Sequence, residues 1–104
     1  MSIHSTALGT TVGNIYVATG TQGNVVSVSY FCNRNGSSTT FSLYLVPAGF
    51  TANANNIIYS NKTLTSNDTY ILELEKMILS QGDMLQAVAN TGNAIVATVS
   101  ALGI

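Results

Sequence analysis

Two runs of alternating apolar and polar residues occupy the middle of the chain. In the first run, Val25–Cys32, apolar side chains recur at every second position, and the second run, Thr39–Val46, repeats this spacing. A period of two places such side chains on one face of a β-strand. The polar stretch between the runs, Asn33–Ser38, is rich in Asn and Ser and contains a Gly, which is typical of a turn between paired strands. We therefore predict a central β-hairpin. Its inward residues would be Val26, Val28, Tyr30 and Cys32 in the first strand and Phe41, Leu43 and Leu45 in the second.

Shorter alternating segments flank the hairpin, and residues that favour turns separate them. They predict five further strands, at Asn14–Thr19, Ile57–Thr63, Thr69–Glu75, Met84–Ala89 and Ala94–Leu102. Their inward side chains would be Ile15 and Val17, then Tyr70, Leu72 and Leu74, then Leu85, Ala87 and Ala89. Between the third and fourth of them, Glu75–Leu79 contains good helix formers and predicts a single helical turn.

This sequence of strands and turns, without a long helix, predicts an all-β fold. We expect a single antiparallel β-sandwich of about seven to eight strands, jelly-roll-like or Ig-like. A chain of 104 residues has the length of one domain. Residues 12–104 would form the sandwich, and residues 1–11, which show no periodicity, would form an extended N-terminal arm.

Charged residues are scarce. They make up 7% of the chain, against about 25% in an ordinary globular protein, and the net charge is −1. Such a chain has no basic field for nucleic acid or anionic lipid, so we expect neither as a partner. No run approaches the roughly 18 apolar residues of a membrane span. The polar surface must therefore consist of Ser, Thr, Asn and Gln.

The scarcity of charge also bears on the edges of the sheets. Monomeric sandwiches blunt their open edges with lysine, proline or inward-pointing charges, and this chain has two lysines and one proline. We therefore expect a homo-oligomer in which partner subunits cover the edges, and an association that depends little on ionic strength. The alternative is a monomer kept soluble by hydroxyl and amide groups.

The start of the chain and its single cysteine suggest where the protein is made. Residues 1–6 lack the basic segment and apolar core of a signal peptide, so we expect synthesis in the cytosol. A lone cysteine excludes an internal disulfide framework and fits a reducing compartment. Three matches to the N-glycosylation sequon would then be incidental.

The carboxylates do not form a convincing catalytic or metal site. Glu73 and Glu75 would project from one face of one strand, about 6.6 Å apart, which is within the range of glycoside hydrolases. Catalytic pairs, however, come from different elements across a cleft, and Lys76 beside these two favours a solvated patch. Asp68 and Asp83 lie in predicted turns, where a carboxylate ordinarily accepts from its own backbone. We expect no enzyme activity, no metal and no cofactor.

Four other residues are candidates for contacts with a partner. Ile3 and His4 lie in the predicted arm, Phe50 is a lone aromatic in a polar loop, and Tyr59 is one of five tyrosines. His4 has no Ser or Asp neighbour that would make a catalytic triad. An exposed loop aromatic such as Phe50 is a reasonable interface anchor, although it could equally fold onto the core. Cys32, on the predicted inward face, is expected to be a small core residue.

The order of motifs along most of the chain is similar to that of the small β-sandwich virion proteins of tailed bacteriophages. The matching features are Cys-Asn-x-x-Gly at Cys32–Gly36, Thr-Phe-x-Leu at Thr40–Leu43, then Pro47, Leu-x-x-Gly-Asp at Leu79–Asp83, and an apolar C-terminal strand. The family has no catalytic residues to transfer. The resemblance implies a structural protein of the virion, made in the host cytoplasm and placed on the capsid surface.

Within that family, the expected function is that of a capsid decoration, or cement, protein. It would bind the major capsid protein and stabilise the assembled shell, as a homo-oligomer for which the resemblance favours a trimer. The alternative is a structural or host-recognition module of the neck, tail or fibres that binds a surface glycan through loop aromatics.

Overall fold

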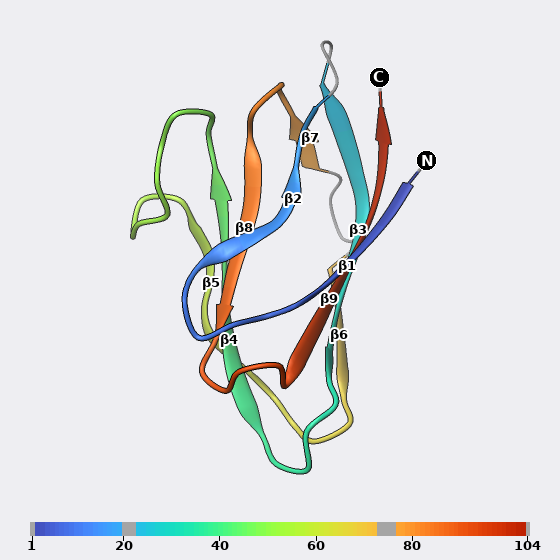
Figure 1. Ribbon diagram of the computed structural model, residues 1–104, viewed down its shortest axis with the longest axis vertical. Coiled ribbons are helices and arrows are strands. Elements are labelled where there is room, and N and C mark those ends of the chain that lie inside the picture. Colours follow the sequence, from blue (N-terminus) through green and yellow to red (C-terminus); the bar gives the residue numbers. More distant parts are fainter. Residues whose placement is uncertain (1, 20–22, 73–76, 104) are drawn as a thin grey trace.

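A computed structural model describes residues 2–19, 23–72 and 77–103 and shows two antiparallel sheets packed face to face. The predicted all-β antiparallel sandwich is therefore confirmed, and the described residues contain no helix. Figure 1 shows the larger sheet on one side and the smaller sheet on the other. The larger sheet contains β1 (Ser2–Ala7), β9 (Ile95–Gly103), β3 (Asn24–Asn33), β6 (Thr69–Leu72) and β7 (Met77–Leu79). The smaller sheet contains β2 (Gly13–Val17), β8 (Met84–Ala89), β4 (Thr39–Val46) and β5 (Ile57–Leu64).

The connectivity is that of a jelly roll. The strand orders are β1-β9-β3-β6 in the larger sheet and β2-β8-β4-β5 in the smaller. The strand pairs are thus nested along the chain: β1 with β9, β2 with β8, β3 with β6, and β4 with β5. Strand β7 pairs with β3 beyond the end of β6, so β6 and β7 together take the place of one strand. Of the two arrangements expected from the sequence, the structure has the jelly-roll one.

The predicted central hairpin is wrong, because β3 and β4 belong to different sheets. Residues 34–38 form an arch that carries the chain across the core instead of a turn between hydrogen-bonded neighbours. The side chain of Asn33, which is completely buried, fixes this arch: its Nδ2 donates to the carbonyl oxygens of Ser37 and Leu64, both at 3.0 Å. The two strands meet through side chains, with the rings of Phe31 and Phe41 stacked at 4.6 Å between the sheets.

The inward face of β3 also differs from the prediction. The register of β3 on β9 shifts between Val26 and Val28, which marks a β-bulge at Ser27. A bulge adds one residue and reverses the alternation beyond it. Val26 faces the core as expected, but after the bulge the buried residues are Ser29, Phe31 and Asn33. Val28, Tyr30 and Cys32 face outward.

Three shorter segments differ from their predicted form. A bulge in β2 buries the neighbouring residues Ile15 and Tyr16 and leaves Val17 exposed. The prediction that Ile15 and Val17 both face inward is therefore wrong for Val17. Met77–Leu79 is a strand and not part of a helical turn, because pairing with the start of β3 competes with a very short helix. Six residues of the predicted N-terminal arm form β1, which lies in the larger sheet beside β9.

The core lies between the sheets and is lined as the remaining alternation predicts. Leu85, Ala87 and Ala89 of β8 are buried, and Ala97 and Val99 face them from β9 in the other sheet. Pro47 follows the last residue of β4, as expected for a residue that cannot donate to a ladder. Gly23, at the start of β3, has a φ of 99°, and a Cβ there would lie 2.6 Å from the backbone oxygen of Leu79.

Candidate functional site

The outer face of the larger sheet combines exposed apolar side chains with hydroxyl groups. The register of the strands places its members in rows: Ile3 beside Ser100 and Val28, and Tyr30 between Thr98 and Ile71. We call this surface the neutral face. Its described members are Ile3, Ser5, Ala7, Val25, Val28, Tyr30, Cys32, Thr69, Ile71, Ile78, Val96, Thr98 and Ser100.

None of these side chains is charged, and four of them are large, apolar and open to solvent. Ile78 is 74% exposed, Ile3 71%, Ile71 46% and Tyr30 40%. Single exposed apolar residues are normal on a protein surface, but a group of them on one sheet face makes this face a candidate binding surface. Because the part of this face that the structure describes has no charge, it suits a partner that is itself neutral.

The outer face of the smaller sheet is more polar. Its middle row contains Asn14, Gln86 and Tyr44, and the amide of Gln86 donates to Asn14 at 2.6 Å. Burying amide groups of this kind in an interface costs free energy, because each amide N–H and oxygen must find a hydrogen-bond partner there. The two faces therefore differ in what they can bury without loss of hydrogen bonds.

The four residues expected to contact a partner are not brought together. Ile3 belongs to the neutral face, whereas the His4 ring packs against Tyr16 of β2 with 5.2 Å between ring centroids. Phe50 is 64% exposed in the loop after β4, at the opposite end of the sandwich from the arch. Tyr59 lies on β5, the edge strand of the smaller sheet, and faces β6 at the edge of the larger sheet.

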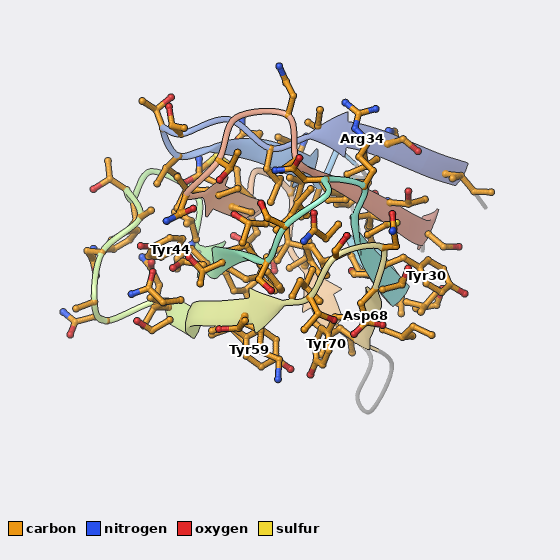
Figure 2. All side chains as sticks on the ribbon, turned by 90° about the horizontal axis from the view of Figure 1, so that it is seen from below. Tyr30, Arg34, Tyr44, Tyr59, Asp68 and Tyr70 are labelled. Carbon is orange, nitrogen blue, oxygen red and sulfur yellow. The ribbon has the colours of Figure 1, made fainter. Side chains whose placement is uncertain are left out.

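Tyr59 and Tyr70 close that edge of the sandwich. Their hydroxyl oxygens are 2.7 Å apart, their rings pack edge to face, and Lys62 Nζ lies 4.7 Å from the centroid of the Tyr70 ring. Figure 2 shows the two tyrosines side by side at this edge, with Tyr30 and Tyr44 on opposite sides of the molecule. The hydrogen bond with Tyr70, together with burial and the nearby Tyr70 charge, raises the pKa of Tyr59 to about 12. The contacts of this pair join β5 to β6 and stabilise the fold.

A polar hollow of about 250 Å³ lies at the end of the sandwich viewed in Figure 2. It is formed by the arch and the loop before β9, which are joined by a hydrogen bond from Arg34 Nε to the carbonyl oxygen of Asn93 at 3.0 Å. Its lining is Arg34, Asn35, Thr91, Gly92, Asn93 and Ala94. The hollow is open, and Phe50 lies at the other end of the sandwich, so an aromatic platform and this hollow do not combine into one site.

The carboxylates in turns accept hydrogen bonds from backbone N–H groups. Asp83 accepts from the N–H groups of Ala48 and Ser80, both at 2.9 Å, and Asp68 accepts from Thr69 at 2.9 Å. This is the turn chemistry that the sequence predicts. Glu73, Glu75 and the predicted inward Leu74 lie outside the described residues. Cys32, predicted in the core, is half-buried on the neutral face.

Sequence reasoning misplaced four members of the neutral face, among them Val28 and Cys32, which were expected in the core. Tyr30 was expected in the core and Ile78 in a helical turn, whereas both are exposed on the sheet. A signal for Tyr30 was present: Phe31 is the largest purely apolar side chain of β3 and lies out of phase with Val26. If Phe31 must face the core, the strand needs a bulge between the two residues, and Tyr30 then points outward.

No family model matches the chain, and searches of the curated proteins and of the solved structures return no match either. Among the residues that the structure describes, there is no helix long and apolar enough to cross a membrane.

Proposed function

We propose that this chain is a structural protein of a phage virion, and specifically a capsid decoration protein that docks on the assembled shell through the neutral face. The observation that carries the proposal is that the described residues of this face are uncharged and leave Ile3, Tyr30, Ile71 and Ile78 exposed. The jelly-roll connectivity agrees with the proposal, because viral capsid proteins are among the users of this fold.

The proposed mechanism is preferential binding to the assembled state. A protein that binds neighbouring capsid subunits in the shell, and not the separate subunits, shifts the equilibrium toward the shell by mass action. Burial of the neutral face would supply the affinity, at roughly 25 cal/mol for each Å² of apolar surface removed from water. The major capsid protein is the proposed partner, and no chemical step is involved.

The test is whether the protein stabilises undecorated shells and does so through the neutral face. Adding the wild-type chain should raise the temperature at which purified shells break open, measured by light scattering and fluorescence. Ile71→Lys places a charge on this face beside Tyr30 and should abolish both binding and the shift. Ile58→Lys is the matched control: Ile58 is 38% exposed on β5, in the other sheet, and this variant should act as wild type.

A wild-type chain that leaves the disruption temperature unchanged would contradict the cement role. Equal loss of binding in Ile58→Lys and Ile71→Lys would show that a different surface docks on the shell.

The polar hollow beside Arg34 favours a second candidate, a glycan-binding module of the neck, tail or fibres. Amide, hydroxyl and guanidinium groups around a hollow of about 250 Å³ are suitable donors and acceptors for a sugar. Binding on a glycan array that disappears in Arg34→Ala, with the shell unaffected by the protein, would support this candidate instead.

A further inference from the structure

The edges of the two sheets are not equally protected against pairing with another strand. In β5, Asn61 has a positive φ of 51° and the register is irregular, and Lys62 adds a charge. Strand β2 contains a bulge, and within the described ranges β6 and β7 span four and three residues. These are the devices by which proteins blunt sheet edges. Strand β1 has none of them: its six residues pair with β9 without a shift and include neither lysine nor proline.

The backbone groups on the free side of β1 can be assigned from the ladder. Leu8 N–H donates to the carbonyl oxygen of Ile95 at 2.8 Å, in continuation of the β1–β9 register. Hydrogen-bonded and non-hydrogen-bonded pairs alternate along an antiparallel ladder. Residues 2, 4 and 6 therefore bond to β9, and Ile3, Ser5 and Ala7 direct their N–H and C=O groups away from it. All three of these residues are exposed.

We propose that β1 pairs with β1 of a second copy of this chain, antiparallel, with Ser5 on the two-fold axis. The chain would then be a dimer and not the trimer that the resemblance favours. In this register Ile3 lies opposite Ala7 of the copy, Ser5 lies opposite Ser5, and the free N–H and C=O groups of all three residues find partners. Ile3 and Ala7 then pack together on the neutral face. Strand β1 has no charged residue, so the axis brings no like charges together.

The size of the neutral face supports a second copy as the occupant, and this part of the argument rests on the proposed function. The larger sheet is four strands wide, and β1 pairs with β9 over six residues. With strands about 4.8 Å apart and about 3.4 Å per residue, one neutral face covers about 400 Å². A stable interface uses about 800 Å² on each partner. Pairing through β1 joins two neutral faces into one continuous surface of about that size.

The pairing itself is tested on the purified full-length chain, without the shell. Sedimentation and light scattering should give twice the 10.9 kDa mass of the chain. Ser5→Pro should give the single mass. Because the Ser5 N–H points away from β9, proline there removes no backbone hydrogen bond within the monomer and loses only the exposed hydroxyl contact with Thr98. Prolines are tolerated on edge strands with the N–H side free. Far-UV circular dichroism confirms that the variant is folded.

Disulfide trapping identifies the register and does not depend on the proline variant. In a Cys32→Ser background, Ser5→Cys should form a covalent dimer under mild oxidation, because Cα atoms in a hydrogen-bonded antiparallel pair are about 5.5 Å apart. The matched control is Thr98→Cys. Thr98 lies beside Ser5, with their hydroxyl oxygens 3.3 Å apart, but it is one strand away from the axis. Its copy would be about 14 Å distant, which is too far for a disulfide.

A dimer that Ser5→Pro dissociates and Ser5→Cys traps would support the pairing, whether or not the protein binds shells. A wild-type chain that remains monomeric at all concentrations would overturn it. A dimer that persists in folded Ser5→Pro, or that the Ser5→Cys variant does not trap as a disulfide, would overturn it too, since the copies would then meet elsewhere.

Discussion

Asn33 is a buried amide at the point where the chain leaves one sheet for the other. Its Nδ2 donates to the carbonyl oxygens of Ser37, Leu64 and Thr65, and its Oδ1 accepts from the Asn35 N–H. The side chain therefore holds the arch closed and ties it to the turn after β5. A hydrophobic residue of similar size could fill the space but would leave these backbone groups without partners.

Removing this amide should be costly for stability. We expect Asn33→Ala to lower the free energy of unfolding by about 2–3 kcal/mol, because buried carbonyl groups lose their donor and a small cavity forms. The measurement is chemical denaturation followed by circular dichroism. Asn35→Ala is the control: its side chain accepts from the Gly36 N–H at an exposed site, and a change within about 0.5 kcal/mol is expected. Equal effects of the two substitutions would contradict the role given to Asn33.

The hydroxyl pair of Tyr59 and Tyr70 should make stability depend on pH in the alkaline range. An unfolded tyrosine ionises near pH 10, and in the folded protein the pKa of Tyr59 is raised to about 12 by the bond with Tyr70 and by burial. Folding thus favours the neutral form of Tyr59. The resulting stability is complete below about pH 10 and is lost as the pH rises toward 12.

This dependence can be measured from phenolate absorbance and from urea midpoints across the alkaline range. Tyr70→Phe removes the hydrogen bond and should lower the pKa of Tyr59 toward its ordinary value. The Tyr59 phenolate should then appear at lower pH, and the loss of stability between pH 10 and 12 should become smaller. Tyr44→Phe, which removes a hydroxyl from the outer face of the smaller sheet, should leave the pH range unchanged. An unaltered pH range in Tyr70→Phe would show that the bond is not the main cause of the shift.

At the scale of elements, alternation in the sequence was enough to locate most strands. It also gave the correct inward residues for β8, and for Tyr70 and Leu72 of β6. It failed where a bulge reverses the pattern, in β2 and β3, because a bulge depends on how a strand fits its neighbour and not on its own composition. The outward side chains of β3 on the neutral face, Tyr30 among them, were missed for this reason.

The connection between β3 and β4 shows a second limit of local patterns. A polar stretch between two alternating runs fits a hairpin turn and an arch between sheets equally well, since both place apolar side chains toward the core. What decides between them is the pairing of distant strands: β3 with β9 and β4 with β8. These contacts join segments far apart in the sequence, so no window along the chain reveals them.

For the whole molecule, the jelly roll leaves two outer sheet faces of different chemistry and one regular edge. The neutral face has apolar and hydroxyl groups, the opposite face has bonded amides, and β1 presents free backbone donors and acceptors beside Ile3. A surface of this kind is suited to permanent association with neutral partners. The proposal of a virion protein follows from this combination and from the order of the motifs.

The most direct test of that proposal is the copy number of the chain in purified particles of the phage that is proposed to encode it. Quantitative mass spectrometry against the major capsid protein measures this ratio. We predict one copy per capsid subunit, or a fixed fraction of that number that places the protein regularly over the whole shell. A chain that is absent from the particle, or present only in the few copies of a neck or tail component, would contradict the decoration role.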